Sequence, residues 1–147
     1  MSTLPSFDDV RAAAERLKGR VVRTPMLRHP VLDAAVGGTV LVKPEPLQRT
    51  GSFKFRGATN AVLRMPAERR AGGVVTHSSG NHGQAIASAC AAEGVRALIA
   101  MPKDAPGIKV ESTRRWGAEL FFFDRLSTDR DALAQQLAEQ RSATLIP

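Results

Sequence analysis

One lysine stands where its side-chain amine could act as a nucleophile. Lys54 lies in residues 50–58 (TGSFKFRGA), which open a helix expected over residues 53–65, with Thr50 or Ser52 as its cap. A cation at this end of a helix meets the positive end of the helix dipole. In one interpretation the side chain points outward and solvent screens the dipole. In the other, the dipole and partial burial disfavour the ammonium form, and the neutral amine can form an imine with a carbonyl group.

Short polar side chains gather in a second segment, residues 76–83 (THSSGNHG). This segment follows an expected strand over residues 73–77 and opens an expected helix over residues 81–93, so it lies at the carboxyl edge of a parallel sheet, where ligands bind. Backbone N–H groups at such a helix start can hold an anion, and the short side chains suit a carboxylate or a hydroxyl group. The alternative is an ordinary turn in which serine and asparagine side chains cap the helix. No glycine-rich run ends in Lys-Ser or Lys-Thr, so a P-loop is not supported.

The elements that must position these residues alternate between strand and helix. Strands are expected over residues 39–43, 73–77, 95–101, 119–123 and 144–146. Helices are expected from a cap at Ser6, over residues 53–65, 81–93 and 107–116, and from a capping box at residues 128–131 to about Gln140. Continuous apolar strands separated by helices predict an α/β fold of βαβ units, with a parallel sheet that carries helices on both faces.

Composition narrows the class of protein. The chain has 147 residues, 43% of them hydrophobic and 24% charged, which is typical of a globular domain. No apolar run approaches the ~18 residues of a membrane helix, and no secretory signal is visible, so a cytoplasmic protein without a membrane partner is expected. The net charge of +7 could attract nucleic acid. The arginines are spread along the chain and tyrosine is absent, however, which favours a solvated basic surface over a nucleic-acid partner.

The other reactive side chains give weaker signals. The single cysteine, Cys90, lies in an apolar helical pattern, which indicates a structural thiol of the core. His29, His77 and His82 are not spaced as a helical metal pair, and no metal site is expected.

A series of motifs runs through nearly the whole chain, in residues 23–27, 43–48, 50–58, 74–85, 101–106, 109 and 113–119. In this order they resemble the fold-type II pyridoxal-phosphate enzymes, and most of all their branch of serine/threonine dehydratases (threonine ammonia-lyases) and serine racemases. Cysteine-synthase-like relatives carry a different segment around the lysine, so residues 52–57 favour the dehydratase branch. The resemblance implies pyridoxal 5'-phosphate as the cofactor and a two-domain fold-type II architecture, of which this chain would form an incomplete part.

The resemblance also implies roles for individual residues. Lys54 would be the Schiff-base lysine and, as the free amine, would remove the α-proton of the substrate. Phe53 would flank the cofactor ring, and Asn81 would hydrogen-bond its phenolic oxygen. Ser79 matches the second acid/base of serine racemases, although the whole branch shares its loop. The substrate carboxylate would be held by one loop, which consists of Ser78, Ser79, Gly80, Asn81 and His82.

The implied reaction is β-elimination from a hydroxy amino acid. The cofactor withdraws electrons from the α-carbon, the β-hydroxyl is lost, and hydrolysis gives a keto acid and ammonia. Serine would yield pyruvate and threonine 2-oxobutyrate.

Chains of this family are about twice as long, and the resemblance places several of their functional groups after residue 147. These are the glycine-rich loop for the cofactor phosphate, the contact to the pyridine nitrogen and the metal ligands of some members. Residues 1–52 would then be the N-terminal part of the large domain and residues 53–142 the small α/β domain. Residues 143–147 would start the return to the large domain. Apolar surface that packs against the missing half is expected to be exposed.

The expectation is therefore the N-terminal portion of a dehydratase, inactive or weak by itself. Three alternatives stay open: a serine racemase-like enzyme, one piece of a split enzyme, and a non-catalytic remnant that binds a ligand or a protein. The expected partner is a small amino-acid substrate, serine or threonine. A homodimer or a complementing C-terminal polypeptide is left open.

Overall fold

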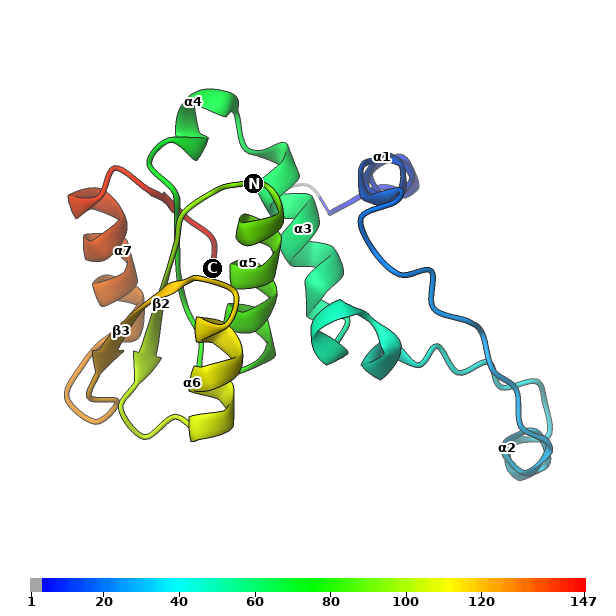
Figure 1. Cartoon of the computed structure of the whole chain (residues 1–147). Helices are drawn as coiled ribbons and strands as arrows, with labels where there is room; N and C mark the ends of the chain where they lie inside the picture. Colours follow the sequence, from blue (N-terminus) through cyan, green and yellow to red (C-terminus); the bar gives the residue numbers. More distant parts are fainter. Residues whose placement is uncertain (1–3) are drawn as a thin grey trace.

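The structure is a computed structural model that describes residues 4–147. Its α-helices are α1 (Phe7–Leu17), α2 (Pro30–Val36), α3 (Lys54–Arg64), α4 (Ala67–Arg70), α5 (Asn81–Ala92), α6 (Gly107–Arg114) and α7 (Arg130–Gln140) (Figure 1). Two short 3-10 turns, η1 (Glu45–Leu47) and η2 (Arg49–Gly51), precede α3. The strands are β1 (Val74–His77), β2 (Ala97–Pro102), β3 (Glu119–Phe123) and β4 (Thr144–Leu145).

The four strands form one parallel sheet in the order β3-β2-β1-β4. The sheet is covered on both faces, because one apolar cluster joins it to α3 and α5 and a second joins it to α7. Every residue of β2, the central strand between β1 and β3, is buried. The predicted α/β fold with helices on both faces is therefore confirmed.

Small side chains let α5 pack closely between the sheet and α3. Ala85, Ala89 and Cys90 are fully buried, and this cluster also contains Phe55 and Val62 of α3. Cys90 is a core thiol, as expected, and burial raises its pKa to about 12. The packing of α5 against α3 matters for function because each helix begins with one of the two predicted site segments.

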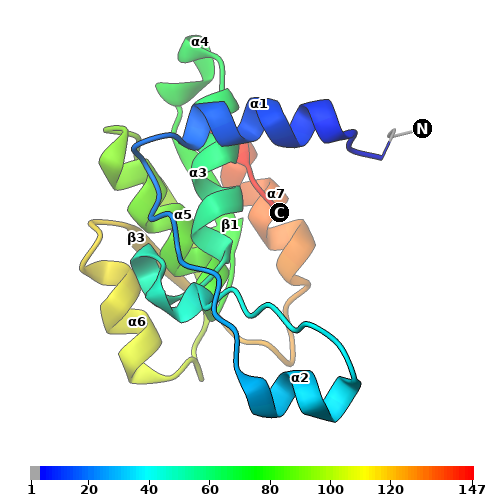
Figure 2. The ribbon, with the colours of Figure 1, turned by 90° about the vertical axis from the view of Figure 1, so that its right-hand side faces the viewer.

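An N-terminal arm, residues 4–53, lies to one side of the sheet and its helices. Figures 1 and 2 show α1 and α2 along this side, with α2 well away from the sheet. Most of the exposed large apolar side chains belong to this arm, among them Phe7, Val31, Val36 and Leu47. The expectation of exposed apolar surface is thus met, and the N-terminal arm contributes little to the core.

Several local predictions were wrong. Residues 39–43 form no strand, since the described chain offers them a single antiparallel bridge between Leu27 and Val42. Neither Thr50 nor Ser52 caps α3: its N-cap is Phe53, without a side-chain hydrogen bond. Asp129, not Thr128, caps α7. The short helices α2 and α4 were not predicted.

No helix in the described part of the chain is long and apolar enough to cross a membrane. The cytoplasmic location stays a prediction.

Candidate active site

The two segments predicted to carry chemistry lie next to each other in the structure. Lys54 is the first residue of α3, and the 78–82 loop joins β1 to the start of α5. Burial lowers the pKa of His82 below its ordinary value of 6.5, and the nearby charges of Lys54 and His77 lower it further, against a smaller opposite effect of the Ile146 backbone. The lowered pKa favours the neutral imidazole of His82, and the charge of Lys54 at the start of α3 reaches this residue in the first turn of α5.

Lys54 itself is exposed, with Nζ 5.4 Å from the centre of the Phe53 ring. The partial burial considered for this lysine is not present within the described chain. Phe53 is 62% exposed, so a broad face of its ring is free to contact a planar group. Phe55, two residues on, is only 1% exposed and anchors the start of α3 in the core.

A partly buried ionic network fixes the first turn of α3 to the N-terminal arm. Arg56 donates from Nε to Glu45 Oε2 at 2.8 Å and from Nη2 to Glu45 Oε1 at 2.7 Å. Thr24 donates from Oγ1 to Glu45 Oε1 at 2.6 Å, and Arg56 also donates to the Val22 carbonyl at 3.0 Å. The Arg56 guanidinium holds the pKa of Glu45 at about 2, against a usual 4.5. The network orients the helix that carries Lys54.

Sequence reasoning gave no role to this network. Its members do fall within three motifs used for the family resemblance, in residues 23–27, 43–48 and 50–58. A Thr, a Glu and an Arg at separated motif positions were the available signal, but only the fold shows that they meet.

The 78–82 loop leaves the start of α5 open. Ser78 is tied to the sheet by its N–H, which donates to the Ala100 carbonyl at 2.9 Å, and its Oγ accepts from Gly80 N–H at 3.2 Å. Gly80 is the N-cap residue, and no side chain caps the helix. The alternative of an ordinary capped turn is therefore wrong. The first N–H groups of α5 remain available to an anion, as the functional interpretation requires.

The first turn of α5 lies very close to β2 and to Ser78 at Gly83. A Cβ atom at Gly83 would come within 2.9 Å of Ile99 Cγ2 and 3.2 Å of the Ser78 carbonyl oxygen. Glycine is thus needed for the first turn of α5 to sit against β2 while Ser78 keeps its place.

Two polar side chains of the site differ in their hydrogen bonding: one has no partner and the other accepts from a lysine. His82 Nε2 is buried and has no hydrogen-bond partner among the described residues. Asn81 Oδ1 accepts a hydrogen bond from Lys109 Nζ at 2.9 Å. In the sequence Lys109 is one of the motif positions shared with the family, and its contact with Asn81 could not be predicted from the sequence.

These groups fit the chemistry of pyridoxal phosphate. The site offers an accessible amine on Lys54, an exposed aromatic face on Phe53 and an amide on Asn81, which match an aldehyde, a planar ring and a phenolic oxygen respectively. The uncapped start of α5 and the unpartnered His82 Nε2 leave further polar groups for a ligand. Which group each residue would contact remains a proposal.

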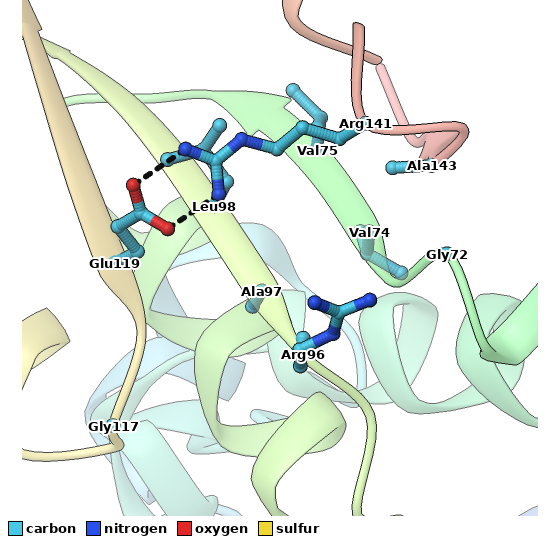
Figure 3. Close-up of a pocket in the computed structure, with 10 residues that line it drawn as sticks. All are labelled: Gly72, Val74, Val75, Arg96, Ala97, Leu98, Gly117, Glu119, Arg141 and Ala143. Carbon is cyan, nitrogen blue, oxygen red and sulfur yellow. Dashed lines mark hydrogen bonds and ion pairs between the residues drawn. The ribbon is translucent and has the colours of Figure 1, made fainter. Parts of the chain in front are cut away.

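Two hollows of about 400 Å³ each lie at opposite ends of the sheet. Ser78 and Ser79 line the one at the carboxyl ends of the strands, with His77 and Asp131 beside them. The other lies at the amino ends, where Arg141 pairs with Glu119 and Arg96 lies nearby (Figure 3). None of the predicted site residues lines this second hollow.

Several known proteins are similar to this chain over nearly its whole length. The chain is 51% identical over 144 residues to an L-threo-3-hydroxyaspartate ammonia-lyase of Pseudomonas sp., which covers 98% of this chain and 45% of that protein. It is 41% identical to a serine racemase of Schizosaccharomyces pombe, with 98% and 45% covered. The structure of maize serine racemase superimposes with a TM-score of 0.92 at 36% identity, over 99% of this chain and 44% of that one. The chain thus spans less than half the length of these relatives.

The family model described as pyridoxal-phosphate dependent enzyme matches residues 17–147. The relatives are ammonia-lyases and serine racemases, as the motifs indicated, and the matched fold is that of the fold-type II enzymes. The chain belongs to the family of pyridoxal-phosphate dependent enzymes.

Proposed function

We propose that this chain is the N-terminal part of an ammonia-lyase that eliminates the β-hydroxyl group of a hydroxy amino acid. The observation that carries the proposal is the position of Lys54 at the start of α3, beside the uncapped 78–82 loop at the start of α5. Serine and threonine are the proposed substrates. The 51% identity with a 3-hydroxyaspartate ammonia-lyase adds that β-hydroxy dicarboxylic acid to the substrates worth testing.

Each site residue has a proposed task. Lys54 Nζ would hold the cofactor and, as the free amine, would take the α-proton of the substrate. The backbone N–H groups of the 78–82 loop and the Asn81 and His82 side chains orient the substrate carboxylate. Ser79 holds or delivers a proton on the other side of the α-carbon. When bound, pyridoxal phosphate supplies an electron-withdrawing ring that stabilises negative charge at that carbon.

A racemase is the second candidate, and Ser79 is the residue that would supply its second acid/base, although dehydratases of the branch share this loop. The Ser79 hydroxyl is placed in the same loop as Ser78, facing the hollow at the carboxyl end of the sheet. A proton accepted by Lys54 on one side and returned by Ser79 on the other would invert the α-carbon without loss of ammonia.

The exposed apolar side chains of the N-terminal arm support a division of the chain. We assign residues 1–52 to a large domain and residues 53–142 to a small α/β domain, with residues 143–147 beginning the return to the large domain. Val31, Val36 and Leu47 are between 59 and 66% exposed, and a complementing C-terminal polypeptide or segment would cover them. A homodimer is a further partner to test.

The test joins this chain to the C-terminal part of the Pseudomonas relative, either as a fusion or as two mixed polypeptides. The joined enzyme should bind pyridoxal phosphate and release ammonia and a keto acid from serine, threonine or 3-hydroxyaspartate. The same enzyme with Lys54→Ala is the matched control and should release none. Cofactor binding without release of a keto acid would contradict the proposed dehydratase activity. Conversion of L-serine to D-serine without release of ammonia would support the racemase activity.

A further inference from the structure

The side chain of Asn81 is held by a lysine from a neighbouring helix. Lys109 Nζ donates to Asn81 Oδ1 at 2.9 Å, and the two residues belong to the first turns of α6 and α5. No carboxylate in the described residues pairs with Lys109. A half-buried lysine is therefore directed at an amide oxygen rather than at an acidic partner.

The backbone of Lys109 is held in place, and this limits the positions that its side chain can reach. Its N–H donates to the Pro106 carbonyl at 2.8 Å, and its own carbonyl accepts from Thr113 Oγ1 at 2.9 Å. Thr113 is fully buried, and α6 packs against α5. The backbone of Lys109 is thus held at a constant distance from the start of α5.

The chemistry of the pair dictates which way the amide faces. A lysine ammonium can only donate, whereas an asparagine side chain has one accepting oxygen and one donating nitrogen. Asn81 must therefore turn Oδ1 toward Lys109. Its Nδ2 then points away from α6 as a free donor, and a donor is what an ionised phenolic oxygen requires.

We propose that Lys109 is a positioning residue that fixes the amide of Asn81, so that Nδ2 and not Oδ1 is presented to the phenolic oxygen of the cofactor. This inference rests on the proposed function, because it takes Asn81 as the partner of that oxygen. Lys109 touches neither cofactor nor substrate in this role. It acts through the orientation of one amide group.

A reversal of the lysine's hydrogen-bonding character gives the sharpest test. Glutamate in Lys109→Glu accepts a hydrogen bond from Nδ2, so Asn81 would turn Oδ1 toward the phenolic oxygen and set two acceptors against each other. In the joined enzyme this variant should weaken cofactor binding by about tenfold or more. Lys109→Met, which leaves the amide free to rotate, should weaken binding by about threefold, and Lys109→Arg should bind as the unchanged enzyme does.

Lys103→Glu is the matched control. Lys103 is exposed on the turn before α6, and its replacement by glutamate makes the same change of charge. Its side chain forms no hydrogen bond with Asn81 in the described part of the chain. It should alter cofactor affinity less than twofold. In an Asn81→Ala background, Lys109→Glu should lose its extra effect and match Lys103→Glu, because the amide through which it acts is gone.

A second measurement uses the 147-residue chain alone, without cofactor. In ¹⁵N-edited NMR spectra, Lys109→Glu should move the Asn81 Nδ2 protons downfield as they become hydrogen-bonded, whereas Lys109→Met and Lys103→Glu should leave them near their starting positions. Equal spectra for Lys109→Glu and Lys103→Glu would overturn the proposed orientation.

The two claims fail separately. If borohydride traps the cofactor on Lys54 but Lys109→Glu and Lys103→Glu bind it equally well, the proposed function stands and the role of Lys109 is wrong. If the joined enzyme binds no cofactor at all, the proposed function fails, and the role of Lys109 falls with it.

Discussion

His77 Nε2 lies 2.7 Å from Asp131 Oδ1, and this contact links the last residue of β1 to the second residue of α7. The link lies directly before Ser78 and Ser79. It connects the candidate substrate loop to a helix on the opposite face of the sheet from α3 and α5.

Removal of this link should loosen the loop. Asp131→Ala is expected to speed backbone hydrogen exchange at residues 78–80 and to lower the free energy of unfolding by about 0.5 to 1 kcal/mol, since Asp131 is itself exposed. Asp8→Ala is the matched control, because Asp8 is likewise the second residue of a helix and has no contact with the sheet. Equal exchange rates at residues 78–80 in the two variants would contradict the linking role.

The Glu45–Arg56 pair should make stability depend on pH in acid. The pKa of Glu45 is about 2 in the folded chain, against an ordinary value of 4.5, because Arg56 hydrogen-bonds the carboxylate. The unfolded chain therefore takes up this proton more readily between these values. The stabilisation of the folded chain by this pair is complete above about pH 4.5 and is lost as the pH falls toward 2.

Glu45→Gln should consequently lower the free energy of unfolding at pH 7 by about 1 to 2 kcal/mol. Urea titrations at several pH values should show that the difference between variant and unchanged chain shrinks as the pH falls from 4.5 to 2. A difference that stays constant over this range would mean that the pair does not hold Glu45 ionised.

Gly83 should not tolerate a methyl group. In Gly83→Ala the new Cβ would lie 2.9 Å from Ile99 Cγ2, so α5 must shift away from β2 or displace Ser78, at a cost of about 1 to 3 kcal/mol. Gly57→Ala is the matched helical control, since a Cβ there meets nothing within 4 Å. It should be neutral or stabilise the chain by about 0.5 to 1 kcal/mol. Thermal unfolding of the two variants tests both expectations. Equal melting temperatures would contradict the close packing of Gly83 against Ile99.

Periodicity was enough to predict the sheet and the helices that cover it. The strands at residues 74–77, 97–102 and 119–123 are short apolar runs that each begin shortly after a glycine, and these local signals are strong. The N-terminal arm was harder. Residues 39–43 have strand composition, but a strand also needs a partner, and the described chain supplies only the bridge from Leu27 to Val42.

The candidate site was predictable to the extent that it is local in sequence. Lys54 and the 78–82 loop each carry their own signal at the start of a helix. The contacts between distant residues had no such signal: His77 with Asp131, Arg56 with Glu45 and Lys109 with Asn81 are brought together only by the packing of helices around the sheet. These contacts decide how the local motifs are oriented.

The most direct test of the whole account is borohydride trapping of the cofactor in the joined enzyme, followed by peptide mapping. Lys54 is the proposed attachment point because its amine is exposed beside the Phe53 ring and its charge acts on His82 of the 78–82 loop. The reduced cofactor should be found on the peptide that contains Lys54. Lys54→Ala should abolish trapping and turnover, while Lys103→Ala should leave both nearly unchanged. Recovery of the reduced cofactor mainly on another lysine would contradict the active-site assignment and the role given to the 78–82 loop.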